Sequence, residues 1–425
     1  GNYALYTNVS GAGNVAIGDD ALYTSTGHYN TAVGYRSLYA NTTGSENVAV
    51  GNGALDANTT ADGNVSVGYY ALSATTTGAS NSALGGRALQ NNTTGAENTG
   101  LGWGALYANT TASYNTSVGA NSLYTNTTGA NNSALGFDAL KLNTTGANNV
   151  GVGKGSLATN TTGSENTGVG FQAIHYNTTG DNNTSLGHNS LVNNTTADNN
   201  TAVGKDSLGN TTTGADNTAI GNEVLLANTT GADNTASGKS CMRGNTTGIK
   251  NSALGTHSLY TNTTGGQNVA IGHAAMNSNT TASNNVAVGY YALLSNNTGA
   301  SNTAIGKDSG QSLTTGSHNV LIGQQAGFYN TALTTGDENI IVGSYSYTNS
   351  ATDSSVQVFG YNVGGDSGYT TIGMGTSDIR SAHGNITWST VSDERYKKDI
   401  VDSTAGLSFV NALQPRTFKY KNLGE

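Results

Sequence analysis

The sequence is poor in cysteine and in charged residues. It has one cysteine, Cys241, so no disulfide can form within the chain. Charged residues make up 10% of its 425 residues, against about 25% in typical domains. Its net charge is −9 and it has no basic patch, which argues against a nucleic-acid partner. A charged, disordered chain is also excluded, because 35% of the residues are hydrophobic.

Long hydrophobic runs are missing as well. No stretch reaches 18 apolar residues, so no transmembrane helix and no membrane insertion are expected. There is a single proline and no three-residue glycine period, which excludes collagen. The sequence shows no secretory segment and starts at Gly1 in the middle of a pattern, so we expect a fragment or a processed chain. What is abundant is glycine, with asparagine, threonine, alanine and serine around it.

A 17-residue repeat dominates the sequence. Each unit ends its first extended run with a glycine, in the pattern Asn-x-small-aliphatic-Gly. Up to Gly323, successive glycines of this kind are 17 residues apart, except for Gly18 and Gly34, which are 16 apart. Such a strict period predicts stacked, nearly identical coils. The fold class is therefore expected to be all-β, a repetitive β-solenoid or β-roll with 17-residue coils. The glycines are Gly18, Gly34, Gly51, Gly68, Gly85, Gly102, Gly119, Gly136, Gly153, Gly170, Gly187, Gly204, Gly221, Gly238, Gly255, Gly272, Gly289, Gly306 and Gly323.

Each unit contains two short runs that alternate with period two, which is typical of strands. Residues 30–34 are an example of the first run and residues 105–109 of the second, and Asn-Thr-Thr-Gly or Asn-Thr-Thr-Ala follows as a turn. Val33 and its equivalents should form an aliphatic ladder, as should Leu38 and its equivalents in the second run. The small residues beside them should face the other way and lie against other chains. Ser237, which replaces an aliphatic residue, should be a weak point.

The repeat also has a recognisable pattern. Residues 14–18 (Asn-Val-Ala-Ile-Gly), residues 268–272 and their copies resemble the head repeat of trimeric autotransporter adhesins, a left-handed β-roll with three chains side by side. Similar repeats occur in bacteriophage tail fibres. The resemblance covers roughly residues 1–345 and implies a homotrimeric fibre. Two large aliphatic residues per coil give a thin core, so we expect stability to depend on oligomerisation.

The composition changes after about residue 345. Residues 390–400 and the following Leu-Gln-Pro-Arg-Thr-Phe segment resemble the start of the intramolecular chaperone domain of endosialidase-type phage tail spikes. That family trimerises, assists folding and then cuts itself off. The resemblance places the cut at the Val391–Ser392 bond, with Ser392 and Lys397 as catalytic residues. A serine nucleophile needs a base, and a lysine can serve. The simpler alternative is that Ser392 is a helix N-cap, with Glu394 in the first turn.

These boundaries give three predicted domains. Residues 1–345 form a β-repeat shaft, residues 346–391 an irregular β capping region, and residues 392–425 the truncated start of the chaperone, a short α-containing segment. No cofactor and no metal site are expected. The seven histidines lack ligand spacing, and Cys241 is expected to be a small buried residue.

Three repeated features leave alternatives open. Acidic residues recur before the first run, as at Glu46 and Glu97, and are either a solvated edge or oxygen ligands for Ca²⁺. Asn-x-Thr turns, as at Asn109, are either turn chemistry or glycosylation acceptors. Stacked threonine pairs also suit an ice-binding surface.

The predicted function is structural and adhesive. The chain is expected to form a homotrimeric phage tail fibre that attaches the virion, outside the cell, to a host surface glycan or protein receptor. A rigid rod would multiply weak identical contacts. No substrate-directed enzyme activity is expected beyond single-turnover autoproteolysis. The main alternative is a bacterial trimeric surface adhesin, and a second alternative is an ice-binding β-solenoid.

Overall fold

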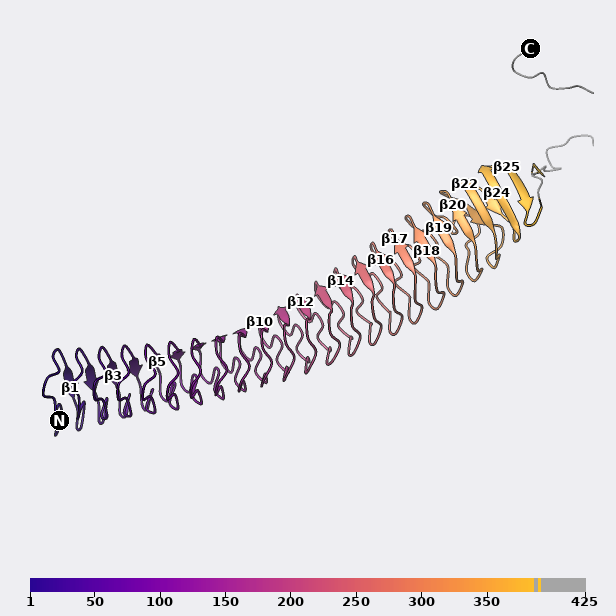
Figure 1. Ribbon diagram of the computed structural model, residues 1–425. Helices are drawn as coiled ribbons and strands as arrows, with labels where there is room; N and C mark the ends of the chain where they lie inside the picture. Colours follow the sequence, from indigo (N-terminus) through magenta and orange to yellow (C-terminus); the bar gives the residue numbers. More distant parts are fainter. Residues whose placement is uncertain (386–388, 391–425) are drawn as a thin grey trace, which may run out of the picture.

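The protein is a long, gently curved rod built from stacked coils (Figure 1). The computed structural model describes residues 1–385 and 389–390. About 21 coils of roughly 17 residues follow one another, which confirms the all-β solenoid predicted from the period. The described residues contain no helix, and therefore none that could cross a membrane. The predicted α-containing segment lies outside the described residues.

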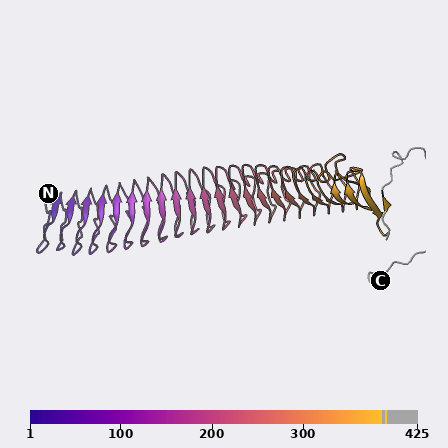
Figure 2. The same cartoon turned by 90° about the horizontal axis from the view of Figure 1, so that it is seen from above.

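Each coil of the regular array contributes one three-residue strand, and the strands stack in one row along the rod (Figure 2). Neighbouring strands are parallel and in register, so that Thr167 pairs with Val150 on one side and with Thr184 on the other. These strands are β1 (Val15–Ile17), β2 (Thr31–Val33), β3 (Val48–Val50), β4 (Val65–Val67), β5 (Ser82–Leu84), β6 (Thr99–Leu101), β7 (Thr116–Val118), β8 (Ser133–Leu135), β9 (Val150–Val152), β10 (Thr167–Val169), β11 (Thr184–Leu186), β12 (Thr201–Val203), β13 (Thr218–Ile220), β14 (Thr235–Ser237), β15 (Ser252–Leu254), β16 (Val269–Ile271), β17 (Val286–Val288), β18 (Thr303–Ile305), β19 (Val320–Ile322) and β20 (Ile340–Val342).

The glycine that ends each strand is required by backbone geometry. Gly153 has φ of 125°, a region that side chains rarely adopt. A Cβ atom at this position would lie 2.3 Å from the carbonyl oxygen of Gly170 in the next coil. The repeat therefore keeps glycine here because the chain turns sharply while two backbones touch.

The second predicted run is not a strand. It forms a series of turns in which the leucine adopts a left-handed conformation, as Leu140 does with φ of 50°. The prediction of a second extended run was therefore wrong. The leucine ladder itself is confirmed, because these side chains are completely buried. Adjacent alanines such as Ala139 are buried too, which a strand would not allow.

The predicted facing of the first run was also wrong. The small central residue of each strand points into the coil, and the aliphatic third residue points outward. Ala134 is buried, whereas Leu135 is 50% exposed. The reason is the thinness of the coil: a Cβ atom on Gly151 would lie 3.3 Å from Cδ1 of Leu140. The leucine of one coil thus fills the space beside the next strand and leaves room only for a small residue.

Two columns of buried asparagine complete the interior. In the first column, Asn47 donates from Nδ2 to the Ala61 carbonyl at 2.9 Å and accepts the backbone N–H of Asn64 at 2.9 Å. In the second, Asn143 donates from Nδ2 to Oδ1 of Asn126 at 2.8 Å and to the Gly146 carbonyl at 2.9 Å. The bond from Asn143 to Asn126 joins two coils, and the bond to Gly146 closes the Asn-Thr-Thr turn. One asparagine side chain therefore stabilises both the stacking and the turn.

The second column is interrupted, and the interruptions leave polar atoms without partners. Residue 75 is threonine, residue 211 is threonine and residue 313 is leucine in the places where asparagine would continue the column. In the coils just before them, Oδ1 of Asn58, Asn194 and Asn296 is buried with no hydrogen-bond partner. These orphan atoms arise because the next coil offers no amide donor.

Toward the C-terminal end of the array, the core exchanges large and small residues. Gly310 and Gly327 replace the turn leucine, whereas Leu321 and Ile341 replace the small central strand residue. A Cβ atom on Gly310 would lie 2.6 Å from Cδ1 of Leu321. The total core volume is thus conserved although its parts are rearranged.

Beyond the array, the sheet continues and then reverses direction. β22 pairs in parallel with β20 and β24, and β25 and β26 then add antiparallel. β21 and β23 form a separate two-stranded sheet. The predicted boundaries at residues 345 and 391 stay predictions. The remaining strands are β21 (Tyr347–Thr348), β22 (Gln357–Tyr361), β23 (Gly364–Gly365), β24 (Tyr369–Met374), β25 (Ser377–Ala382) and β26 (Ser389–Thr390).

Candidate functional surfaces

The catalytic residues predicted from the sequence cannot be placed. Ser392, Lys397 and the Val391–Ser392 bond lie outside the described residues. Their assignment to self-cleavage stays a prediction. The candidate functional regions of the described part of the chain are therefore its surfaces: the outward face of the strands and the turns beside it.

The outward face of β1–β20 carries an apolar column with one polar interruption, which we call the sheet face. The third residue of every one of these strands is valine, leucine or isoleucine, except Ser237 in β14. Several of these side chains are about half exposed, including Leu84 and Leu254. Because the column points outward, Ser237 replaces a surface residue and leaves no cavity in the core. The weak point expected there concerns this face rather than the interior.

The turns beside the strands form a second surface, which we call the turn edge. It consists of the two residues after each closing glycine and the two residues after each turn leucine. These positions vary strongly between coils, whereas the buried leucine between them hardly changes. The residue after the leucine is, in five consecutive coils, Tyr107, Tyr124, Lys141, Ala158 and His175.

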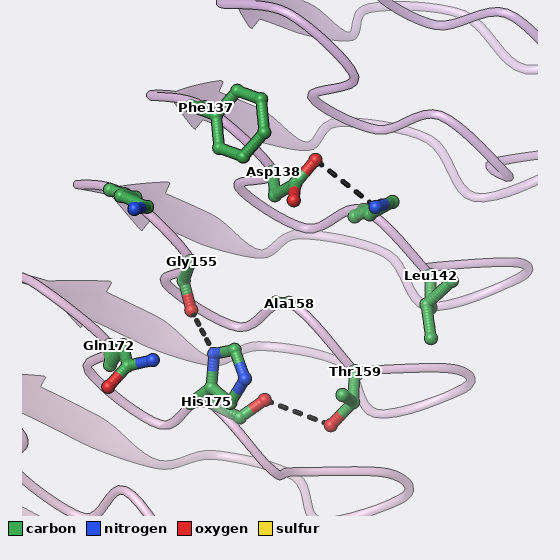
Figure 3. Close-up of a pocket in the computed structure, with 10 residues that line it drawn as sticks. Phe137, Asp138, Leu142, Gly155, Ala158, Thr159, Gln172 and His175 are labelled. Carbon is green, nitrogen blue, oxygen red and sulfur yellow. Dashed lines mark hydrogen bonds and ion pairs between the residues drawn. The ribbon is translucent and has the colours of Figure 1, made fainter.

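A groove of about 350 Å³ opens on the turn edge across three coils (Figure 3). It exists because the middle coil carries small residues between bulkier neighbours. The floor is formed by Gly155 and Ala158, and Phe137 lies toward one end with His175 toward the other. The remaining lining residues are Asp138, Lys141, Leu142, Lys154, Thr159 and Gln172.

The polar groups of the groove are held in fixed positions. Nδ1 of His175 lies 2.7 Å from the carbonyl oxygen of Gly155. The hydroxyl of Thr159 donates to the carbonyl of His175 at 2.9 Å. Nζ of Lys141 lies 3.3 Å from Oδ1 of Asp138, an exposed ion pair. The two backbone contacts fix the side chains of His175 and Thr159 and so give the groove a defined shape.

Lys154 gives the groove its excess positive charge. Its Nζ lies 5.9 Å from the centre of the Phe137 ring. No ion pair of Lys154 occurs within the part of the chain that the structure describes. With Lys141 and Asp138 offsetting each other, the groove carries a net positive charge on a chain whose overall charge is −9. It can therefore receive a ligand with both apolar and anionic parts.

The other candidates from the sequence take structural places. Cys241 is buried, and burial raises the pKa of its thiol to about 12. Asn109 is completely buried within the second asparagine column and cannot carry a glycan in the folded coil. Glu46 is exposed at a left-handed turn. Among the described residues, no cluster of three or more His, Cys, Asp or Glu could hold a metal ion.

The threonine pairs run along the outside of the rod. The first threonine of a pair uses its hydroxyl within the fold: Oγ1 of Thr110 donates to the carbonyl of Thr127 at 3.1 Å. The second threonine is exposed, as Thr145 is. The hydroxyl of the first threonine in each pair therefore links two coils, and the second threonine lies on the surface.

Sequence reasoning missed the groove. Phe137, Lys154 and Gly155 occupy positions that change from coil to coil, and attention to the repeated residues passes over them. The sequence does mark the groove at the positions where neighbouring coils differ, because a glycine and an alanine stand there between bulkier residues.

Comparison with known protein families finds a match at the C-terminal end of the chain. The family model described as chaperone of endosialidase matches residues 392–425. No curated protein and no solved structure matches the chain. The chain is therefore a β-solenoid whose C-terminal segment resembles the endosialidase chaperone, as the sequence indicated. The resemblance of the repeats to adhesin heads stays a prediction.

Proposed function

We propose that the protein is a homotrimeric attachment fibre of a bacteriophage tail, with its three solenoids packed through the sheet face. The observation that carries the proposal is the outward valine, leucine and isoleucine column, which continues through β1–β20 with one polar interruption. Isolated exposed apolar residues are common, but a long contiguous apolar patch marks an interaction site.

The dimensions of the sheet face suit a stable interface. Twenty stacked strands at about 4.8 Å each give a length of about 90 Å. The three-residue strands, whose first residues lie beside the apolar third residues on the outward side, give a width of about 10 Å. The resulting area of about 900 Å² is close to the ~800 Å² that each partner buries in a standard protein interface. Identical coils in each copy place like residues opposite one another, which favours another copy of the chain as the partner.

The C-terminal match supports three copies and a tail fibre. Proteins that carry the endosialidase chaperone form trimeric fibres, and a rod of stacked coils suits such a fibre. Attachment to a host surface would use the turn edge, because its residues vary and lie outside the packed core. The protein would then be located in the virion and act outside the cell.

Cysteine cross-linking tests the proposed interface directly. Leu135→Cys, made in a Cys241→Ala background, places a thiol on the sheet face. Oxidation is expected to give a covalent dimer band on a denaturing gel, because two of three thiols can pair. Thr145→Cys, on the exposed turn of the same coil, is the matched control and is expected to stay uncrosslinked. Equal cross-linking of both variants, or none in Leu135→Cys, would refute the sheet face as the interface.

We also propose that the chain is cut between Val391 and Ser392 after assembly. Ser392 supplies the nucleophile and Lys397 the base, as the resemblance to the self-cleaving chaperone implies. Intact-mass measurement on the protein expressed with its complete gene tests this. A fibre chain ending at Val391, and an uncut chain in Ser392→Ala, are expected. Cleavage that persists in Ser392→Ala would rule out this serine as the nucleophile.

A further inference from the structure

Exposed aromatic residues occupy the turn edge in alternate coils. Each comes directly after a closing glycine, and each is 34 residues, or two coils, from the next. All five side chains are between 41% and 53% exposed. We call this set the aromatic row. Its members are Tyr35, Tyr69, Trp103, Phe137 and Phe171.

The coils between these aromatic residues carry small residues in the same region. Gly53, Gly86, Ala120 and Gly155 each lie in one of the four intervening coils, in the first or second position after the closing glycine. The indole of Trp103 leans over Gly86, where a Cβ atom would lie 3.4 Å from Cδ1 of the ring. The row thus alternates a projecting ring with a small residue. The small residues are not all open, because the ring of Tyr70 lies against Gly53 as that of Trp103 lies against Gly86. The groove at Gly155, beside Phe137, is an open recess of about 350 Å³ along the row.

The alternation ends after Phe171. The next residues in the same position are His188, Lys205, Asn222 and Lys239. The buried leucine column continues unchanged through these coils, so the fold does not need the alternation. A pattern that folding does not require, and that is confined to one part of the rod, indicates a ligand.

Basic residues adjoin two of these small residues in the sequence. Arg87 follows Gly86, and Lys154 precedes Gly155. Both side chains are exposed. In these two coils the turn edge combines an exposed cation with the aromatic residues of the neighbouring coils, whereas the chain as a whole is acidic.

We propose that the aromatic row binds an extended acidic polysaccharide that runs along the fibre. Two coils span about 9.6 Å, which is close to the length of a disaccharide in an extended β-linked chain. Successive disaccharides would place the apolar faces of their sugar rings against successive aromatic rings. The carboxylates would meet Arg87 and Lys154, and four intervals would give additive contacts along one chain. This inference rests on the proposed attachment function and specifies its receptor class.

The row remains accessible in the proposed trimer. Phe137 lines the groove together with Lys141 and Leu142 of the turn edge, on the side of the closing glycine away from the strand. Packing through the sheet face therefore leaves the groove open. Ligand binding and chain assembly use different residues and can be measured separately.

Binding of oligosaccharides of defined length tests the proposal. The probes are hyaluronan, chondroitin and alginate fragments as acidic chains, and chitin fragments as neutral chains, titrated against the whole chain by calorimetry. Affinity for at least one acidic series is expected to rise with length up to about eight sugars, the span of four two-coil intervals. Trp103→Ala is expected to weaken binding at least tenfold. Tyr290→Ala, an exposed aromatic residue outside the row, should change it less than twofold.

A spectroscopic measurement adds an independent readout. In a Trp388→Phe background, Trp103 is the one remaining tryptophan, and its emission is expected to shift when the saccharide binds. Absence of binding to every acidic series, unchanged binding in Trp103→Ala, or equal affinity for chitin fragments would overturn the proposal. A trimer that binds none of the probes would refute the row and leave the fibre standing. A monomer that binds them would refute the proposed assembly and support the row.

Discussion

The interior of the coils and their turn edge follow opposite rules. Inside, the same residues return in coil after coil, as Leu106, Leu123 and Leu140 do. At the turn edge the very next residues are tyrosine, tyrosine and lysine. The interior is fixed because the coil is thin and each buried group contacts its copies above and below. The turn edge is free to vary because it contributes little to folding, and this freedom is what a recognition surface needs.

The largest expected difference lies between two adjacent residues. Leu140→Ala removes a completely buried side chain that packs on Gly151, and is expected to cost about 2–5 kcal/mol of unfolding free energy. Lys141→Ala, one residue along on the turn edge, should change stability by at most about 0.5 kcal/mol. Chemical denaturation of both variants checks the contrast. Similar losses in the two variants would contradict the division between interior and edge.

The exchanged core at Gly310 gives a second test. Gly310→Leu restores the usual turn leucine but collides with Leu321, so it is expected to destabilise by about 1–3 kcal/mol. Leucines in the equivalent turns adopt the same left-handed backbone, so the conformation itself is tolerated. Adding Leu321→Ala recreates the pairing of ordinary coils and should recover most of the loss. Additive losses in a double-mutant cycle would show that the two positions do not share space.

The buried thiol predicts a pH dependence. Burial raises the pKa of Cys241 to about 12, so the native state keeps the thiol proton at a pH where the unfolded chain, with a pKa of about 8.5, has lost it. The stability of the wild type should therefore fall as pH rises through 8.5. Relative to Cys241→Ala, the fall between pH 7.5 and 9.5 is expected to be about 1.4 kcal/mol. Parallel stability curves for the two proteins would mean that the thiol is not protected in the fold.

Repair of the asparagine column should give the smallest change, and a stabilising one. Thr75→Asn supplies an amide donor for the orphan Oδ1 of Asn58 and restores the continuous column. One recovered buried hydrogen bond is expected to add about 1 kcal/mol. Thr77→Asn, at the exposed second threonine of the same turn, serves as the control and should add nothing. A stabilisation that is equal in both would point to a general effect of asparagine in the turn.

The sequence was sufficient for the architecture, because a 17-residue period with fixed glycines leaves few alternatives to stacked coils. It was not sufficient for the direction of side chains. Val33 and Leu38 look alike in the sequence, yet one is on the surface and the other is in the core. The difference depends on the left-handed backbone at Leu38 (φ of 51°), which alternation cannot reveal. The Asn109 side chain was assigned to a turn, and its second role, a hydrogen bond to Asn92 of the preceding coil, needs the stacked structure.

The candidate surfaces were less accessible to prediction. The groove around Gly155 is made by three coils whose side chains differ, so no single repeat contains it. Ser392 and Lys397 were found through a family resemblance instead, which the match over residues 392–425 supports for the segment but not for their chemistry.

The most direct test of the account is the native mass of the protein. Native mass spectrometry of the wild type and of Leu135→Lys, which places a charge on the sheet face, compares assembly with and without the apolar column. The account predicts that the wild type has three times the mass that its single chain shows under denaturing conditions. It also predicts that the variant dissociates and loses its β-solenoid circular dichroism at a lower temperature than the wild type. A wild-type monomer, or a variant that assembles as well as the wild type, would contradict it.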